Sequence, residues 1–201
     1  MSKEATPDHP IHDLITKRWS PYGFSDKPVA REDLLGLFEA ARWAASSYNE
    51  QPWGYIVGTR EQPEQFERVL SCLVEGNQAW ARAAPVLALG VVSLAFKRND
   101  KPNAAAEHDL GLASGNLCFE ATNRGLFVHQ MIGILPDKAR EVFAIPESCS
   151  AKTGLAIGYR AEPETLPEEL RERDLAPRQR KPVAEFVFGN RWGETSELVG
   201  S

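Results

Sequence analysis

The stretch PVLALGVVSL, residues 85–94, constrains the fold of this chain more than any other segment. It has the length of a strand, and a strand that is apolar at nearly every position is buried on both of its faces. The longer apolar stretch that contains it, residues 84–96, is interrupted by Gly90 and Ser93. It falls short of the about 18 residues that a membrane-spanning helix needs. The run therefore predicts a buried strand and no membrane association.

Helical and strand-like segments are separated along the rest of the chain. Apolar spacing predicts helices at residues 11–17, 31–45, 66–73, 107–123 and 137–143, the third of them stopping near Gly76 and Asn77. Runs of β-forming residues predict strands at 55–59, 85–94, 126–131 and 154–159. With no visible repeat, the pattern predicts a layered α+β or α/β protein with one sheet.

The domain organisation is expected to be simple. Residues 1–10 are interpreted as a flexible leader, and residues 11–201 as a single domain. From residue 162 to 181 the chain becomes charged and rich in proline. We expect residues 162–193 to form an arm that lies over a surface and stays out of the core.

Charge and cysteine content narrow the function classes. The formal net charge is -5 and the pI is near 5.5, which argues against a nucleic-acid-binding protein. The three cysteines, Cys72, Cys118 and Cys149, show no CxxC spacing and indicate free thiols in a reducing compartment. The polar N-terminus lacks an apolar signal core. A soluble cytoplasmic protein is expected.

The common catalytic motifs are missing. The four histidines, His9, His12, His108 and His129, have no partners at ligand spacing, so no metal site is predicted. There is no dinucleotide-binding glycine fingerprint and no phosphate-binding P-loop. The serines of ASSYN lack the flanking glycines of a hydrolase nucleophile elbow.

Two clusters of anion-binding side chains remain. Arg18-Trp19-Ser20 lies near the N-terminus, and Arg178-Gln179-Arg180-Lys181 lies near the C-terminus. Guanidinium groups and hydroxyls are the side chains that hold a phosphate, although each cluster alone could be solvated surface charge. Together they are weak evidence for one anionic pocket in a net-acidic protein.

A third segment, AASSYNEQPWGYIVG at residues 44–58, runs from a helix end through small and amide residues into a strand. In combination with RxS at Arg18 and Ser20, GLFVHQMIGILPDKAREVFAIPE, GLAIGY and PRQRKPVAEFVFGNRWG, it resembles the FMN-dependent nitroreductase family. The resemblance runs in order from about residue 11 to residue 193. It implies an α+β fold with a mostly antiparallel central sheet flanked by helices. It also implies an intertwined homodimer with FMN in the subunit interface.

The resemblance assigns the cofactor site residue by residue. Arg18 and Ser20 match residues at the FMN phosphate and ribityl chain, with backbone from Trp19, and Arg178 and Arg180 match the C-terminal basic pair on the same phosphate. The edge of the ring system is matched by the segment Gln130, Met131, Ile132 and Gly133, whose backbone N–H at Ile132 or Gly133 would support flavin N5. Asn77 is matched to the pyrimidine edge. The corner residues Ala45, Ser46, Ser47 and Asn49 are expected to reach FMN from the partner subunit.

Two positions depart from the family pattern. Ala45 stands where proline is usual, and Tyr22 stands where a lysine or arginine commonly lies beside flavin N1 and O2. Tyr22 could face that edge, donating one hydrogen bond in place of a charge-assisted one. Alternatively it only stacks in its loop or contacts substrate.

The activity that the resemblance implies is that of an FMN-dependent oxidoreductase. It would take a hydride from NADH or NADPH and reduce a nitroaromatic, quinone or similar flat acceptor by a ping-pong mechanism, with no side-chain acid or base required. A flavin-binding redox sensor or FMN reservoir with little turnover is the alternative, and a partner-binding scaffold without flavin is a third reading.

Overall fold

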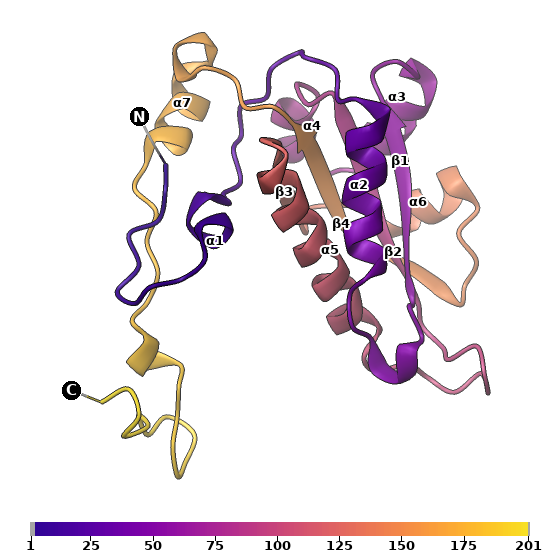
Figure 1. Cartoon of the computed structure of the whole chain (residues 1–201). Coiled ribbons are helices and arrows are strands. Elements are labelled where there is room, and N and C mark those ends of the chain that lie inside the picture. Colours follow the sequence, from indigo (N-terminus) through magenta and orange to yellow (C-terminus); the bar gives the residue numbers. More distant parts are fainter. Residues whose placement is uncertain (1–2, 201) are drawn as a thin grey trace.

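The computed structural model describes residues 3–200 and is built around one antiparallel sheet (Figure 1). Its strand order is β1-β2-β4-β3, and every neighbouring pair is antiparallel. The strands span Trp53–Thr59 (β1), Val86–Ser93 (β2), Phe127–Met131 (β3) and Cys149–Gly158 (β4). The predicted α+β class with a mostly antiparallel sheet is confirmed.

The described residues form seven α-helices, of which α2 to α6 pack on the sheet and α1 and α7 belong to the terminal segments. They span Asp13–Lys17 (α1), Arg31–Arg42 (α2), Pro63–Ser71 (α3), Glu75–Ala81 (α4), Ala106–Asn123 (α5), Pro136–Phe143 (α6) and Glu168–Leu175 (α7). Short 3-10 turns lie at Ser47–Asn49, Pro163–Thr165 and Val183–Glu185.

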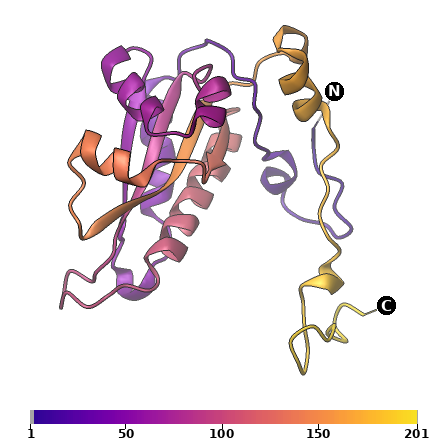
Figure 2. The same ribbon diagram turned by 180° about the vertical axis from the view of Figure 1, so that it is seen from behind.

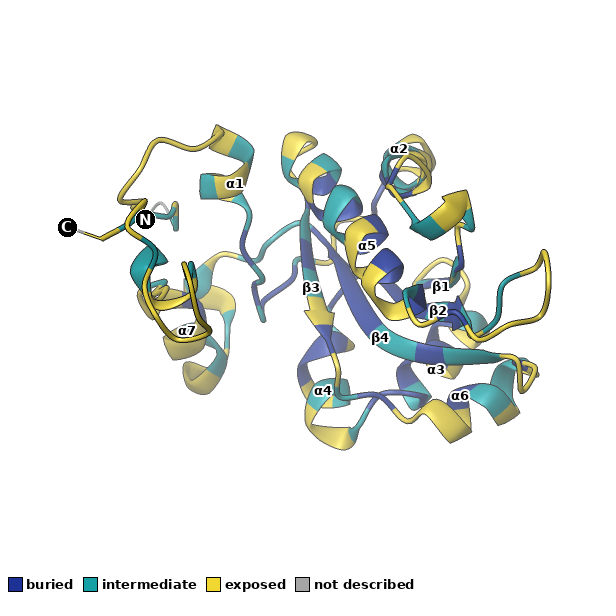
Figure 3. Cartoon of the chain, turned by 90° about the horizontal axis from the view of Figure 1, so that it is seen from below, coloured by how far each residue is buried: buried dark blue, intermediate teal, exposed yellow. Residues whose placement is uncertain are grey.

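Strand β2 is covered on both faces, as its apolar run predicts. Val86 and Ala88 belong to a core cluster with residues of α2 and α5. Leu87 and Leu89 point to the opposite face and belong to a second cluster with residues of α3, α4 and α6. Figure 3 shows these two helical layers on opposite sides of the strands. The side-chain alternation of a strand therefore fixes a three-layer arrangement.

Helix α5 is the longest helix and forms as its sequence predicts. Acidic residues Glu107 and Asp109 occupy its first turn, where their negative charges interact favourably with the positive end of the helix dipole. Its buried stripe includes Leu110, Ala113 and Leu117. The chain turns after the helix at Gly125, whose φ of 72° lies in the left-handed region that glycine adopts without strain.

Three sequence expectations on local structure are wrong. The predicted stop near Gly76 and Asn77 lies inside α4, where burial of Trp80 against the core outweighs the low helix propensity of glycine. Helix α2 ends at Arg42, and β4 begins earlier than predicted, at Cys149. Helix α7 was not predicted, because the charged segment that forms it has no apolar stripe.

The N-terminal and C-terminal segments of the chain run side by side, away from the main helix and sheet layers (Figures 1 and 2). Arg178 donates to the carbonyl oxygens of Lys3 (3.1 Å) and Thr16 (2.6 Å), and Lys3 Nζ donates to the carbonyl oxygen of Asp174. The N-terminal leader is thus bound to the C-terminal segment in this structure. The flexibility predicted for residues 1–10 stays a prediction.

Ala144 ends α6 in a left-handed conformation, with φ 50° and ψ 41°. Its N–H and that of Ile145 both donate to the carbonyl oxygen of Arg140. A left-handed residue with a Cβ is strained by about 1–2 kcal/mol, whereas glycine loses about 0.5–1 kcal/mol of extra backbone entropy on folding.

We therefore expect Ala144→Gly to raise the free energy of unfolding by about 0.5–1 kcal/mol in chemical denaturation. Ala139→Gly, at a buried and regular helical position of α6, is the matched control and should lower it by about 1 kcal/mol or more. Equal losses in both variants would show that Ala144 is not strained.

Candidate cofactor site

Three arginines gather where the N-terminal and C-terminal segments meet. Nη1 of Arg18, just after α1, donates to Ser20 Oγ over 3.3 Å. Burial lowers the pKa of Arg178, and the positive charges of Arg18 and Arg180 lower it further. Within residues 3–200, none of the three forms an ion pair with a carboxylate. Like charges held together without a counter-charge favour binding of an anion.

Arg178 and Arg180 differ in how they are held. Arg178 is half-buried and fixed by the two carbonyl oxygens described above. Arg180 is exposed, and among residues 3–200 its guanidinium donates only to the adjacent carbonyl oxygen of Gln179, from Nη1 over 2.7 Å. Arg180 is therefore the one whose guanidinium is free to turn toward a ligand.

The loop that carries Arg18 lies against the end of β3. Nε2 of Gln130 donates to Cys118 Sγ over 3.2 Å. Burial raises the pKa of the Cys118 thiol, and the positive charge of Arg18 opposes that rise. Arg18 is therefore close enough to act on the Cys118 thiol. Trp19 is buried with its ring edge-on to Phe127 at 5.8 Å. The Arg18 loop and the Gln130 segment thus meet within one chain.

Asn77 and Gly133 are in direct contact. Asn77 Nδ2 donates to the carbonyl oxygen of Gly133 over 2.9 Å, and its Oδ1 accepts from the Trp80 indole N–H over 3.3 Å. A Cβ on Gly133 would lie 2.5 Å from Asn77 Nδ2, so this approach requires glycine. The side-chain amide of Asn77 is engaged in the fold, which weakens its predicted role at the pyrimidine edge.

The residues between β3 and α6 offer unused backbone donors. Met131 is buried in the core, whereas Ile132 is 89% exposed. Among residues 3–200, neither the N–H of Ile132 nor that of Gly133 donates a hydrogen bond. Both can serve an incoming acceptor atom, as the resemblance implies.

Tyr22 lies in an aromatic cluster. Its ring packs edge-on against Trp80 at 5.1 Å and against His129 at 4.7 Å. Its backbone N–H and that of Gly23 donate to the buried carboxylate of Asp174 over 2.8 and 3.0 Å. These contacts favour the stacking alternative for the ring, and a role at the flavin edge stays a prediction.

The corner after α2 is fixed by a buried carboxylate at the start of α5. The N–H of Ser47 donates to Asp109 Oδ2 over 3.1 Å. Ser46 Oγ accepts from the backbone N–H of Gln51 over 3.0 Å, which closes the turn, and Ala45 is exposed.

The same corner carries backbone strain. Tyr48, Asn49 and Gln51 have φ values of 54°, 56° and 52°, in the left-handed region. Such residues cost on the order of 1–3 kcal/mol each and concentrate at functional sites. The bulky Tyr48 is the least expected of the three, and its side chain is 73% exposed. This geometry supports a functional use for the corner.

The predicted site residues fall into two groups, the corner and the Gln130 segment, which lie apart from each other within one chain. Ser47 is held at Asp109, whereas Gln130 is held at Cys118, nine residues later on the same helix. That spacing corresponds to a rise of about 14 Å along the axis. The resemblance assigns the corner to the partner subunit's cofactor, and that assignment stays a prediction.

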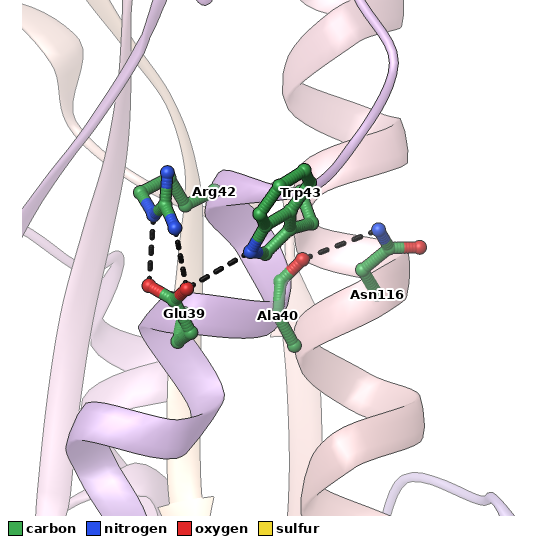
Figure 4. Close-up of polar contacts among 5 residues, drawn as sticks. All are labelled: Glu39, Ala40, Arg42, Trp43 and Asn116. Atoms are coloured by element: carbon green, nitrogen blue, oxygen red, sulfur yellow. Dashed lines mark hydrogen bonds and ion pairs between the residues drawn. The ribbon is translucent and has the colours of Figure 1, made fainter.

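A polar cluster that sequence reasoning missed fixes the end of α2 (Figure 4). Glu39 accepts from Arg42 over 2.5 and 2.8 Å and from the Trp43 indole N–H over 2.9 Å. These hydrogen bonds lower the pKa of Glu39 to about 2. Asn116 Nδ2 donates to the carbonyl oxygen of Ala40 over 3.2 Å and ties α2 to α5. Trp43 remains 72% exposed.

Comparison with known proteins decides the family. The profile of the nitroreductase family matches residues 15–159. The chain belongs to the nitroreductase family. The expectation of an NAD(P)H oxidoreductase of this type is thereby confirmed at the level of the family.

Several relatives of this family member are known by sequence or structure. An uncharacterised 15.4 kDa protein of Mycolicibacterium smegmatis is 30% identical over 70% of this chain and 92% of its own length. The major NAD(P)H-flavin oxidoreductase of Aliivibrio fischeri is 35% identical over 46% of this chain and 43% of its own length. A solved structure of an oxidoreductase containing FMN superposes with a TM-score of 0.89 at 32% identity, covering 97% of this chain and 99% of that one.

Residues 3–200 contain neither a membrane-spanning helix nor a cluster suited to a metal ion. No helix within residues 3–200 is long and apolar enough to cross a membrane. In the same part of the family member, no three or more histidine, cysteine or acidic side chains are grouped closely enough to hold a metal ion.

His129 gives a pH-dependent test of the packing beside the site. Its Nδ1 lies 2.9 Å from the carbonyl oxygen of Pro21, to which it donates. Burial lowers the pKa of His129 and the charge of Arg18 adds to this, while the Pro21 contact and Asp174 oppose it. A lowered folded-state pKa means that the unfolded chain binds the proton more readily.

The stabilisation by neutral His129 should therefore be complete above its unfolded pKa of 6.5 and fall as the pH drops toward the folded-state value. We expect the free energy of unfolding to decrease from pH 7 to pH 5, and to decrease less in His129→Gln. Chemical denaturation at each pH measures both. His108→Gln, at an exposed position, is the control. The same pH slope in wild type and His129→Gln would contradict this assignment.

Proposed function

We propose that this protein is an FMN-dependent oxidoreductase that uses NADH or NADPH to reduce nitroaromatic, quinone or similar flat acceptors by a ping-pong mechanism. The observation that carries the proposal is the convergence of Arg18, Arg178 and Arg180 without a carboxylate partner within residues 3–200. A terminal phosphate supplies the missing negative charge. When bound, FMN would supply the hydride chemistry at N5.

The residues present fit that cofactor. The arginines and Ser20 would hold its phosphate, and the unused N–H groups of Ile132 and Gly133 would donate to its ring system. A fixed backbone dipole stabilises the electron density that hydride transfer brings, without exchanging a proton. The role of the chain is to bind the cofactor, to orient it and to polarise its ring system, and no side-chain acid or base is assigned.

The names of relatives support the same activity. The Aliivibrio fischeri relative is an NAD(P)H-flavin oxidoreductase, and a relative from Ectopseudomonas oleovorans, 39% identical over 37% of this chain, is a nitrobenzene nitroreductase. A cytoplasmic location is part of the proposal, supported by three free cysteines, Cys72, Cys118 and Cys149.

An absorbance spectrum before and after addition of each nicotinamide tests the proposal. Purified protein should show a flavin spectrum that NADH or NADPH bleaches within seconds. A flavin spectrum that neither donor bleaches would favour the sensor or reservoir alternative. Protein that neither retains nor rebinds flavin would favour a scaffold.

We expect the bound flavin to be FMN and not FAD, because the arginines converge on a terminal phosphate. Arg180→Ala should remove one charge-assisted pair, worth roughly 1.5–3 kcal/mol, or about ten- to a hundredfold in FMN affinity. Titration of apoprotein with FMN measures this, with Arg191→Ala, at an exposed position further along the same segment, as the control. Intact FAD in the mass spectrum of the extracted cofactor would contradict the prediction.

The homodimer is also part of the proposal, and it is supported by an uncovered apolar face on α5. This apolar face consists of Gly111, Leu112, Gly115 and Phe119, and Trp43, which follows α2, is exposed as well. A Cβ added at Gly111 or Gly115 would meet nothing within 4 Å, so another backbone can approach closely. The C-terminal segment, which carries Trp192 at 93% exposure, extends from the body as an arm suited to wrap a neighbour.

Analytical ultracentrifugation should find a flavin-loaded species of about twice the chain mass of 22.3 kDa. Phe119→Glu, which places a charge in the apolar face, should shift it toward the monomer and release FMN, because burying an unpaired charge is unfavourable. Lys138→Glu, exposed on α6 on the other side of the sheet, is the control. A flavin-loaded wild-type species near 22.3 kDa would exclude the dimer.

A further inference from the structure

A short basic hairpin connects β2 to α5. We call residues 94–103 the basic hairpin, since they include Lys97, Arg98 and Lys101 with one acid, Asp100. Its two arms are paired by the hydrogen bonds from Phe96 N–H to the carbonyl oxygen of Lys101 (2.9 Å) and from Asn103 N–H to that of Leu94 (2.8 Å). The backbone turns at Asp100, with φ 54°. The hairpin is therefore an ordered turn stabilised by its own backbone hydrogen bonds.

The basic hairpin is docked on the strained corner. The backbone N–H of Lys97 donates to Glu50 Oε1 over 2.7 Å. The guanidinium of Arg98 stands 4.0 Å from the centre of the Tyr48 ring, and the Phe96 ring meets Tyr48 edge-on at 5.9 Å. The left-handed conformation of Tyr48 therefore orients its ring so that Arg98 stacks on it.

Besides the Tyr48 ring, the Arg98 guanidinium contacts the ring of Phe96, whose centre lies 5.2 Å away. Within residues 3–200 its guanidinium takes part in no ion pair and no hydrogen bond, and the residue is exposed. Stacking on Tyr48 restricts its orientation and leaves the N–H edge open. A planar fork of donors held in this way suits two oxygens of one phosphate. Glu50, the acidic residue on which the hairpin is docked, already accepts from the backbone N–H of Lys97.

We propose that Arg98, held on Tyr48 by the basic hairpin, is the residue that recognises the 2′-phosphate of NADPH and makes NADPH the preferred donor over NADH. The proposal rests on the proposed function, because it needs the corner at residues 45–49 to border the flavin. The 2′-phosphate is a dianion, whereas NADH has a hydroxyl there, and an arginine is the common device for telling the two apart. Lys97 and Lys101 add positive charge on the same hairpin.

Binding of adenosine 2′,5′-bisphosphate and of AMP to the FMN-loaded protein, measured by calorimetry, tests the recognition without turnover. Wild type should bind the bisphosphate more tightly than AMP. Arg98→Ala should lower the affinity for the bisphosphate roughly ten- to a hundredfold and leave the affinity for AMP unchanged. Arg98→Lys, which keeps the charge but not the fork, should fall between the two. Arg31→Ala, an exposed arginine at the start of α2, is the matched control.

Steady-state and rapid-mixing reduction supply the second readout. Arg98→Ala should raise KM for NADPH about as much as it weakens the bisphosphate, and leave KM for NADH and the limiting rate of flavin reduction unchanged. If Arg98→Ala changes KM equally for both donors, or changes it for neither, the proposal about Arg98 is wrong. The proposed function still holds in that case, provided that a nicotinamide reduces the flavin. If neither donor reduces the flavin, the proposed function fails, and binding of the bisphosphate alone decides whether Arg98 recognises a 2′-phosphate.

Discussion

Burial of β2 on both faces is the constraint on which the rest of this structure depends. Because Val86 and Ala88 face one helical layer and Leu87 and Leu89 face the other, the strand cannot lie at an exposed surface. Helices α2 and α5 pack together against one of those faces. Because α5 carries both Asp109, which holds Ser47, and Cys118, which holds Gln130, the core sets the spacing of the groups that are predicted to bind the cofactor.

The cofactor region itself is stabilised by different forces from the core. Arg18 and Arg180 each repel Arg178, and the fold holds Arg178 through the carbonyl oxygens of Lys3 and Thr16, with no ion pair to any of the three within residues 3–200. An anion that satisfies all three would link the leader, the loop after α1 and the C-terminal segment. In that view the cofactor phosphate is a structural element as well as a ligand, and binding it stabilises the folded state by mass action.

Sequence reasoning recovered what depends on local pattern. The four strands and the helix α5 follow from apolar runs, first-turn acids and Gly125. The arginines that are predicted to bind phosphate stand out in the sequence as unusual charges, and their role stays a prediction. It missed Asp174 because that carboxylate ends a charged run that resembles a solvated surface, and only the fold shows it buried against two backbone N–H groups. Helix α4 was missed because its stabilisation comes from the tertiary burial of Trp80.

The strained corner shows why the remaining part of the site cannot be obtained from sequence alone. Left-handed φ values at Tyr48, Asn49 and Gln51 are not encoded by glycine, so nothing local predicts them. They persist because distant groups over-determine the turn: Asp109 holds Ser47, and the basic hairpin holds Tyr48 through Arg98. A conformation that costs stability and is maintained by two separate elements is expected where its side chains meet a ligand. Here the ring of Tyr48 and the guanidinium of Arg98, which forms no ion pair within residues 3–200, are exposed at the corner that the family resemblance assigns to the partner subunit's flavin.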